Sequence, residues 1–480
     1  MAPEPPPSLP LGHNRPMPDA ITVVRDITRG TPFEDHLFLV GGVPRDRLLG
    51  LPLADDVDIV TDLDALDLAQ LLHRSPLSEH APVVYPRFGT ARLTLAGCAV
   101  ELVTARAENY DAGSRKPSVR RASLVADALR RDFTINTLME GLHGGNTLDL
   151  TGRGLTDLRT GVIRTPLEPK LTFHDDPLRM LRAVRFAVRF GFTIEPQTWG
   201  AMQSEWRRLD LLCERPVVSA ERIRDEFCKT LMLPDASRGL TLLMQCGLMA
   251  AFAPELTAMV GVSQNAWHIH DVWSHTLAAV AAVPVDTDLA VRMAVLLHDA
   301  GKPPTRSVDQ RGIHFYEHPT VGADLAGRLL RRLRFSTHDT ERVTALVGQH
   351  MRLGEARPDW SDSAIRRLVR DTGEELQTLF DIAACDMSAM DPDAPVTDLR
   401  ALRARIDAVN AQYNAARVGS PLAGHELMDL LGLPPGRDVG RAKAHLIELV
   451  LDGSLAPDDT GGAREAAVRW RQADAGGDKT

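Results

Sequence analysis

A glycine pair followed by two closely spaced aspartates constrains this 480-residue chain more than any other feature. Residues 38–61 read FLVGGVPRDRLLGLPLADDVDIVT, with a short apolar strand before Gly41 and Gly42. A second strand carries Asp56 and Asp58, and because side chains alternate along a strand, both carboxylates face the same way. Two carboxylates that face one point repel each other unless a cation lies between them. The stretch therefore predicts a divalent-metal site beside a glycine turn that can approach a phosphate, as nucleotidyl transfer requires.

The residues around this turn follow a recognisable spacing. The matching positions are Gly41, Gly42, Arg45, Asp46, Leu48, Leu49, Gly50, Asp56, Asp58 and Thr61. They resemble the first motif of the tRNA nucleotidyltransferase and poly(A) polymerase family, GGxVRDxLLGxxxxDxDxxT. The resemblance implies that Asp56 and Asp58 are catalytic and bind two Mg²⁺ ions. The nucleotide-binding positions that it implies are Gly41, Gly42, Arg45 and Asp46. Pro44 replaces the usual Val, and Asp55 leaves open which carboxylates of this acidic cluster hold metal.

A third carboxylate lies on a later strand. Residues 83–103 partly alternate between apolar and polar side chains and predict two or three strands. The last of these strands carries Glu101 and resembles the EVTTFR strand of the same family. The resemblance implies that Glu101 is catalytic, either holding metal or deprotonating the attacking hydroxyl. A glutamate on the solvated face of an edge strand is the alternative.

A basic segment follows at residues 110–129, YDAGSRKPSVRRASLVADAL. Its length predicts a loop that is either functional or disordered. The cations that cluster in it are Arg115, Lys116, Arg120 and Arg121. In the family that the chain resembles, a flexible loop at this place assists movement between bases, which implies RNA contacts for these residues. A solvated loop without such a role is the alternative.

Adjacent arginines and an aspartate open the next segment, RRDFTIN, at residues 130–136. A guanidinium can bond two phosphate oxygens at once, and a carboxylate can accept a hydrogen bond from a ribose hydroxyl. The segment resembles the second motif of the family, RRDFTxNA, with Thr137 in place of Ala. The resemblance implies that Arg131, Asp132 and Asn136 bind the nucleotide, with Asp132 selecting ribose.

The pattern becomes helical from Pro166, and a helix is predicted to open at DDPLR, residues 175–179. Asp176 and Arg179 are three positions apart and share one helical face. The segment resembles the EDxxR motif of the family, in which an aspartate and an arginine hydrogen-bond the incoming base. The resemblance implies selection of cytosine or adenine, whose amino groups can donate to an aspartate. The implied nucleotide-binding positions are Asp175, Asp176, Arg179 and Arg182. An intrahelical ion pair is the alternative.

Histidines and aspartates form a second constellation between residues 268 and 386. Imidazole and carboxylate groups are ligands for transition metals, and each needs a partner when it is buried. The candidate metal ligands are His275, His298, Asp299, His318, His350 and Asp386. They resemble the ligands of an HD phosphohydrolase domain, which implies a phosphoesterase site that uses Ni²⁺, Mn²⁺ or another divalent metal. A vestigial domain with satisfied histidines is the alternative.

Composition limits the class of protein. No apolar run approaches the roughly 20 residues of a membrane span, and the Pro-rich start is not a signal peptide. Five cysteines without a CxxC pair indicate a cytoplasmic location. A net charge of −9 requires that any RNA-binding cations be concentrated locally. No protein partner is evident from the sequence.

Together these segments predict an α+β chain. A small polymerase-beta-like nucleotidyltransferase head, built from a mixed sheet with helices, precedes all-helical neck, HD and tail domains. The expected divisions are a disordered Pro-rich tail over 1–20, the catalytic head over 21–160, a neck with the base-selecting motif over 161–262, the HD domain over 263–400, a tRNA-binding tail over 401–457 and a flexible C-terminus over 458–480.

The predicted activity is template-independent addition of nucleotides from CTP and ATP to the 3′ end of tRNA, which is CCA addition or repair. An enzyme that adds only A, only CC or a poly(A) run would share these motifs, although the long basic segment argues against CC addition alone. A protein uridylyltransferase joins a similar head to an HD domain, but no regulatory ligand-binding repeats are evident after residue 400. An RNA-binding remnant would have lost Asp56 or Asp58, and both are present.

Overall fold

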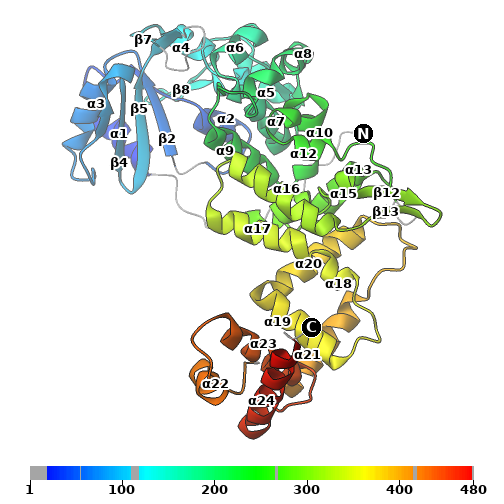
Figure 1. The fold of residues 1–480 in the computed structure, drawn as a ribbon. Coiled ribbons are helices and arrows are strands. Elements are labelled where there is room, and N and C mark those ends of the chain that lie inside the picture. Colours follow the sequence, from blue (N-terminus) through cyan, green and yellow to red (C-terminus); the bar gives the residue numbers. More distant parts are fainter. Residues whose placement is uncertain (1–18, 54–55, 110–117, 265–268, 414–418, 478–480) are drawn as a thin grey trace. The chain divides into compact units, whose positions relative to one another are not determined.

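The computed structural model describes residues 19–53, 56–109, 118–264, 269–413 and 419–477. The chain divides into two compact units (Figure 1). Unit 1 contains the residues up to Pro254 together with Arg332–Arg334, and unit 2 contains Glu255–Arg331 and the residues from Phe335 onward. Unit 1 combines a large sheet with helices, whereas the described part of unit 2 is helical apart from one hairpin. The predicted α+β class is confirmed.

A mixed seven-stranded sheet lies at the centre of the first half of unit 1. Its strands run in the order β3, β4, β5, β2, β1, β8 and β9. β2 and β5 pair in parallel, whereas the other neighbours are antiparallel. The strands are β1 (Leu37–Leu39), β2 (Asp56–Thr61), β3 (Val83–Tyr85), β4 (Thr90–Leu95), β5 (Cys98–Thr104), β8 (Met139–Gly141) and β9 (Thr147–Leu148).

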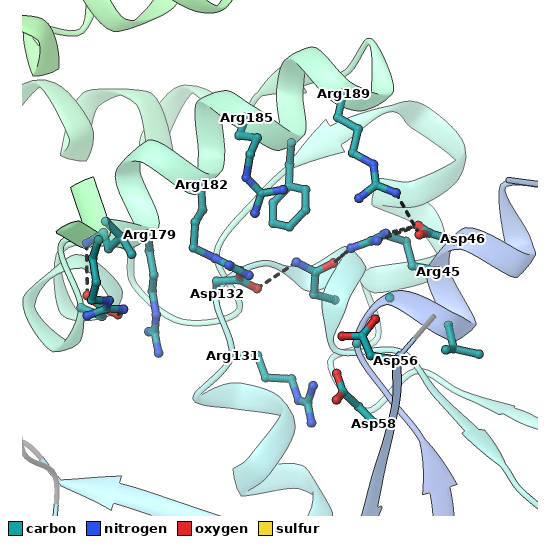
Figure 2. Close-up of a pocket in the computed structure, with 18 residues that line it drawn as sticks. Arg45, Asp46, Asp56, Asp58, Arg131, Asp132, Arg179, Arg182, Arg185 and Arg189 are labelled. Atoms are coloured by element: carbon teal, nitrogen blue, oxygen red, sulfur yellow. Dashed lines mark hydrogen bonds and ion pairs between the residues drawn. The ribbon is translucent and has the colours of Figure 1, made fainter. Parts of the chain in front are cut away.

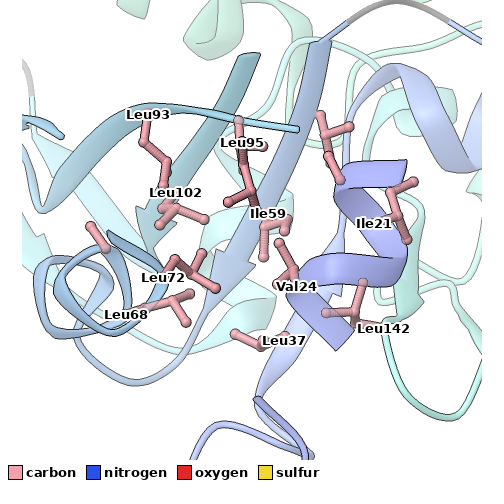
Figure 3. Close-up of a cluster of buried hydrophobic side chains, with 14 of the residues drawn as sticks. Ile21, Val24, Leu37, Ile59, Leu68, Leu72, Leu93, Leu95, Leu102 and Leu142 are labelled. Carbon is pink, nitrogen blue, oxygen red and sulfur yellow. The ribbon is translucent and has the colours of Figure 1, made fainter. Parts of the chain in front are cut away.

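One face of this sheet packs against α1 (Asp19–Thr28) and α3 (Ala65–His73). Figure 3 shows Ile59 and Leu102 of the strands beside Leu72 of α3 in this core. These side chains are fully buried, and burying each contributes roughly 1.5–3 kcal/mol. Because apolar side chains of β2 fill this face, the carboxylates that alternate with them turn to the opposite face.

The basic segment after β5 is not a single loop. β6 (Arg106–Asn109) and β7 (Ser118–Arg121) form an antiparallel hairpin, and α4 (Leu124–Leu129) follows. Ser123 caps this helix by accepting a hydrogen bond from the backbone N–H three residues on. The loop predicted from the sequence is therefore wrong for β7 and α4, and residues 110–117 lie outside the described part of the chain.

Helices make up the rest of unit 1. The longest is α7 (Leu178–Phe190), which buries Met180, Val184 and Ala187 in the core. Two short strands, β10 (Val162–Ile163) and β11 (Thr193–Ile194), pair in parallel. The remaining helices are α2 (Gly42–Leu48), α5 (Gly154–Thr160), α6 (Pro169–Asp175), α8 (Pro196–Glu205), α9 (Ala220–Leu231), α10 (Ala236–Gln245) and α11 (Leu248–Phe252).

The first part of unit 2 is built around α14 (Leu289–Leu297). This helix is apolar and buried, and it packs against α13, α17 and α20. No helix among the described residues is long and apolar enough to cross a membrane. The surrounding elements are α13 (Val272–Ala281), β12 (Arg306–Asp309), β13 (Gly312–Phe315), α16 (His318–Arg332), α17 (Thr337–Gln349), α19 (Asp362–Thr372), α20 (Leu376–Ser388) and α21 (Leu399–Tyr413).

The end of unit 2 is more ordered than the sequence predicted. α22 (Gly424–Leu431), α23 (Arg437–Leu451) and α24 (Thr460–Gly477) share one buried cluster. The flexible C-terminus predicted over 458–480 is wrong for residues 460–477, because Ala467 and its neighbours on α24 are buried in this cluster. Glycines and aspartates at the two ends of the segment obscured its alanine-rich helical interior.

Candidate functional site

The carboxylates of the first motif lie where two parallel strands meet. Asp58 on β2 is directly opposite Glu101 on β5, which confirms the predicted place of Glu101 on a neighbouring strand. Asp56 lies two residues earlier on β2, so the three side chains share one face of the sheet. Burial, followed by the negative charges of Glu101 and Asp56, raises the pKa of Asp58 to about 6. The arrangement concentrates negative charge on one face of the sheet, over its inner strands β2 and β5.

A divalent cation suits this face of the sheet. The raised pKa of Asp58 reflects its burial and the negative charges of Glu101 and Asp56, which a cation would offset. Among the described residues, closely spaced groups of three metal ligands occur only in unit 2, so Asp56 and Asp58 would supply only part of a metal's coordination shell. Mg²⁺ commonly takes one or two carboxylates and completes its coordination with water and substrate phosphates. The two aspartates therefore suit a metal whose shell a bound triphosphate completes.

The glycine turn closes tightly against these carboxylates. Gly41 has a φ of +71°, which side chains rarely adopt. A Cβ at this position would lie 3.1 Å from Oδ2 of Asp58. Glycine therefore meets both the backbone requirement and the spatial requirement, and it leaves room for an anion beside the aspartates.

A cavity of about 480 Å³ opens above the carboxylates. In Figure 2, Arg182, Arg185 and Arg189 reach from α7 toward it, and Asp56 and Asp58 point into it from β2. The cavity brings together nearly all of the nucleotide-binding residues that were predicted from separate segments. The predicted residues that line it are Gly41, Gly42, Arg45, Asp46, Arg131, Asp132, Asn136, Asp176, Arg179 and Arg182.

The helix predicted to open at residue 175 begins later. Asp175 is the last residue of α6 and does not line the cavity. Asp176 has extended backbone angles, φ −143° and ψ 103°, as expected of a residue that precedes a proline. α7 begins at Leu178. Asp175 therefore lies beside Asp176 in the chain but outside the lining of the cavity.

Arg45 and Asp46 form the wall of the cavity between α2 and α7. Nε of Arg45 donates to Oδ1 of Asp46 at 2.7 Å, and another nitrogen of Arg45 donates to Oδ1 of Asn136 at 2.5 Å. Arg189 donates to the other oxygen of Asp46 at 3.1 Å. Arg45 also lies over the ring of Phe190, 4.8 Å from its centroid. These contacts join the first motif, the second motif and α7.

Asp132 is buried and hydrogen-bonded on both oxygens. Oδ1 accepts from Nδ2 of Asn136 at 2.9 Å, and Oδ2 accepts from Nε of Arg182 at 2.8 Å. Burial opposes ionisation of Asp132, but Arg182 and Asn136 hold its pKa down to about 2. Glu226 of α9 accepts from Arg185 at 2.6 Å and so anchors the next arginine of α7. Asp132 is therefore a carboxylate at neutral pH, held in place by residues that also line the cavity.

Sequence analysis missed the residue that orients the two adjacent arginines. Asp127 of α4 is fully buried and pairs with both Arg130 and Arg131. Arg131 lies 2.9 Å from Asp127 and lines the cavity, whereas Arg130 does not line it. The spacing of three and four residues between Asp127 and the arginines was a signal that the sequence offered.

Asp176 and Arg179 line the same cavity, and both already have protein partners. Oδ2 of Asp176 accepts from Arg222 of α9 at 2.8 Å. Arg179 donates to the backbone carbonyl oxygens of Thr172 at 3.2 Å and Arg130 at 2.7 Å. The intrahelical Asp176–Arg179 pair considered from the sequence is replaced by these longer-range contacts. Sequence analysis missed Arg222, whose contact with Asp176 depends on the packing of α9 against α7.

The predicted RNA contacts are described only in part. Arg120 and Arg121 are exposed on β7, and Arg121 donates to the backbone carbonyl of Asp62. Arg115 and Lys116 lie outside the described residues. A role in RNA binding for these four residues stays a prediction.

Unit 2 brings the predicted HD ligands together. Asp299 is central, with carboxylate oxygens 3.2 Å from Nε2 of His298 and 3.7 Å from Nε2 of His318. Asp386 lies 2.8 Å from Nε2 of His275. The cluster draws on the ends or first turns of several helices and consists of His275, His298, Asp299, His318, His350 and Asp386.

The four histidine rings are oriented as metal ligands. Their Nδ1 atoms lie 2.7–3.3 Å from backbone carbonyl oxygens, to which an Nδ1–H can donate. In the neutral form of each ring, which is the form that binds metal, that tautomer directs the Nε2 lone pair into the cluster. Nε2 of His298 is buried without a hydrogen-bond partner. Burial and the charge of His298 lower the pKa of His350 to about 4, which keeps this ring neutral and able to bind metal. The nitrogen-rich set suits a transition metal better than Mg²⁺.

Changing Asp58 to Asn should stabilise the metal-free fold. The pKa of Asp58 is raised from 3.8 to about 6, so the folded state holds this proton more tightly than the unfolded chain does. The ionised carboxylate therefore opposes folding above pH 6, and this cost vanishes below pH 4. In EDTA at pH 8, we expect Asp58→Asn to raise the melting temperature of unit 1 by about 2–4 °C. Asp26→Asn, at an exposed position, is the control. A lower melting temperature for Asp58→Asn at pH 8 would contradict the charge arrangement.

Changing His298 to Ala should remove tightly bound transition metal. The buried Nε2 of His298 is an inward-facing donor, and its loss leaves too few nitrogen ligands around Asp299. After loading with Ni²⁺ or Mn²⁺ and desalting, metal analysis should show at least a tenfold lower occupancy. His338→Ala is the matched control, because His338 is exposed on α17. Equal metal content in all three proteins would show that the cluster is not a metal site.

Comparison with known proteins finds three family models that match successive parts of the chain. The family model for the poly A polymerase head domain matches residues 37–164, and the model for a probable RNA- and SrmB-binding site of polymerase A matches residues 191–260. The HD domain model matches residues 268–392. The histidine cluster lies within the range that the HD model matches, whereas the cavity is lined by residues of the first two ranges and of the segment between them.

Relatives and solved structures point to one family. An A-adding tRNA nucleotidyltransferase of Deinococcus radiodurans is 33% identical over 92% of this chain and 97% of its own length. A CC-adding tRNA nucleotidyltransferase of Thermus thermophilus is 34% identical over 72% of this chain and 78% of its own length. The fold resembles the Bacillus stearothermophilus CCA-adding enzyme in complex with CTP, with a TM-score of 0.66, 22% identity and coverage of 96% of this chain and 100% of that one. The chain therefore belongs to the tRNA nucleotidyltransferase and poly(A) polymerase family, in a form that carries an HD domain.

Proposed function

We propose that the chain adds nucleotides from ATP and CTP to the 3′ end of tRNA without a template. The observation that carries the proposal is a single cavity lined by the glycine turn at Gly41, the carboxylates of Asp56 and Asp58, and several arginines. The names of the relatives agree, since they include an A-adding enzyme, a CC-adding enzyme and a multifunctional CCA protein. The charge of the cavity matches a triphosphate, because its arginines lie opposite its carboxylates (Figure 2).

Different residues have different roles in the proposed phosphoryl transfer. Arg185 and Arg189 face the phosphates, and the turn at Gly41 lets backbone approach them. The 3′-oxygen of the acceptor bonds to the α-phosphorus, the bond from that phosphorus to the β-bridging oxygen breaks, and pyrophosphate leaves. Glu101, beside Asp58, is placed to take the proton of the attacking hydroxyl. Mg²⁺ held by Asp56 and Asp58 would offset the charge that develops on the phosphoryl oxygens.

Asp176 and Arg179 are proposed to read the base, with Arg222 as the third member of the set. Arg222 holds Asp176 before a nucleotide binds, and an exocyclic amino group of cytosine or adenine would donate to the same carboxylate. Arg179 is already fixed by two carbonyl oxygens, so its remaining N–H groups have a set direction. Asp132 is proposed to accept a ribose hydroxyl beside its bonds to Arg182 and Asn136.

Addition of A alone is a second candidate. The relative from Deinococcus radiodurans is an A-adding enzyme, and the match covers nearly the full length of both chains. A CC-adding relative matches over a smaller share of this chain. Since ATP and CTP both offer an amino group to Asp176, the residues that line the cavity are compatible with either outcome.

The HD cluster is proposed to be a metal-dependent phosphohydrolase. Lys302 lies 2.6 Å from Asp299, and a cavity of about 270 Å³ beside the cluster is lined by both residues and by His318. A cation and metal ligands around one cavity suit a phosphate ester, such as a 2′,3′-cyclic phosphodiester at an RNA end. Ni²⁺ or Mn²⁺ is the proposed metal. We also propose that the two units divide further into head, neck, HD and tail domains. The proposed location of the protein is the cytoplasm.

Acceptors of three lengths test the transfer reaction. Purified protein is incubated with Mg²⁺ and tRNA that ends before the first C, after one C or after both, each with labelled CTP or ATP. We expect C on the first two acceptors and A on the third, resolved to single nucleotides on a gel. Addition of A alone on the third acceptor would assign the chain to the A-adding class. Folded protein that extends none of the acceptors would refute the proposal.

A further inference from the structure

A second surface adjoins the catalytic carboxylates on the side away from the nucleotide cavity. Strand register places Arg92 of β4 opposite Glu101, which is itself opposite Asp58. Val83 on the edge strand β3 lies opposite Arg92. These residues form one row across the outer face of the sheet, because paired residues on neighbouring strands share a face. A molecule lying on this row would touch the catalytic carboxylates at one end.

A shallow cavity of about 320 Å³ lies along this row. Its lining combines aromatic rings, two cations and the third carboxylate. The residues are Tyr85, Phe88, Thr90, Arg92, Glu101 and Arg106. Asp56 and Asp58 line the nucleotide cavity, and Glu101 lines this one. Asp58 and Glu101, which line different cavities, are therefore neighbours across the paired strands.

This surface lies outside the hydrophobic core, where a ligand can reach its side chains. Tyr85 is 48% exposed on β3 and Arg92 is exposed, although both lie on a paired strand. Arg106 is held in place, since it donates to the carbonyl of Phe88 at 2.8 Å and to the hydroxyl of Thr90 at 2.9 Å. An exposed tyrosine beside two arginines, one of which is held by hydrogen bonds, provides a stacking face together with charge for a phosphate.

Displacement at phosphorus needs the attacking hydroxyl opposite the leaving pyrophosphate. The triphosphate occupies the arginine side of Asp58 in the proposed function, so the acceptor must approach from the Glu101 side. We propose that Tyr85, Arg92 and Arg106 bind the 3′-terminal nucleotide of the RNA acceptor, with Tyr85 stacking on its base and Arg92 contacting its phosphate. This inference rests on the proposed function and assigns the acceptor half of that site. Since every base has a stacking face, such a platform would accept the changing end of a growing product.

Acceptor kinetics test the platform. Tyr85→Ala should raise KM for tRNA about tenfold, because a stacking contact with one base is lost, while KM for the nucleotide stays unchanged. Tyr85→Phe keeps the ring and should restore the wild-type KM. Val84→Ala is the matched control, because Val84 is the neighbouring exposed residue and pairs with Ala91, whose side chain belongs to the core on the other face.

A binding measurement separates stacking from a structural effect. An RNA acceptor stem with 2-aminopurine at its 3′ end should lose fluorescence when it binds wild type or Tyr85→Phe, and should not when it binds Tyr85→Ala. Arg92→Gln should lower the slope of log affinity against log salt by about 0.7, the loss of one phosphate contact to single-stranded RNA. Arg29→Ala, at an exposed position on unit 1, should leave that slope unchanged.

The outcomes distinguish this inference from the proposed function. If wild type extends no tRNA, the proposed function fails whatever Tyr85 does. If wild type extends tRNA, and Tyr85→Ala shows both the wild-type KM for tRNA and wild-type quenching, the platform is refuted and transfer stands.

Discussion

In the unit that carries the proposed transfer site, Asp58 and Glu101 lie side by side across the parallel β2–β5 pair and repel each other. The sheet can hold these carboxylates side by side because apolar residues such as Ile59 and Leu102 secure the same strands from the other face. Burial, followed by the negative charges of Glu101 and Asp56, raises the pKa of Asp58 to about 6, and a cation would offset the repulsion. The same pair forms the boundary between the nucleotide cavity and the outer face of the sheet, so one electrostatic constraint organises both halves of the proposed reaction.

A network of ion pairs prepares the nucleotide side before any ligand arrives. Arg182 is tied to Asp132, Arg185 to Glu226 and Arg189 to the aspartate of the first motif, Asp46. Because these partners come from separate segments, the arginines of α7 are fixed relative to the strand that carries Asp56 and Asp58. Unit 2 uses a different chemistry, in which backbone carbonyls orient imidazoles around a buried aspartate. The carboxylates of unit 1 would favour a hard cation such as Mg²⁺, and the imidazoles of unit 2 would favour a transition metal.

Local rules predicted the parts of the site that depend on local geometry. Alternation along a strand placed Asp56 and Asp58 on one face, and the glycine pair indicated the tight turn at Gly41. Contacts between distant segments were not predictable in this way. The bond from Arg222 to Asp176 requires the packing of α9 against α7, and the outer face of the sheet emerges only from strand register. The helix α24 was missed because glycine and aspartate at its ends outweighed its alanine-rich centre.

The central claim is that one chain holds two independent sites, an oxygen-ligand transfer site in unit 1 and a nitrogen-rich hydrolytic site in unit 2. A crossed assay tests it most directly, with tRNA extension in Mg²⁺ and hydrolysis of a 2′,3′-cyclic phosphodiester in Ni²⁺ or Mn²⁺ measured for wild type, Asp58→Asn and His298→Ala. The account predicts that Asp58→Asn loses extension and keeps hydrolysis, whereas His298→Ala loses hydrolysis and keeps extension. Extension by Asp58→Asn at the wild-type rate, or loss of both activities in either folded variant, would contradict it.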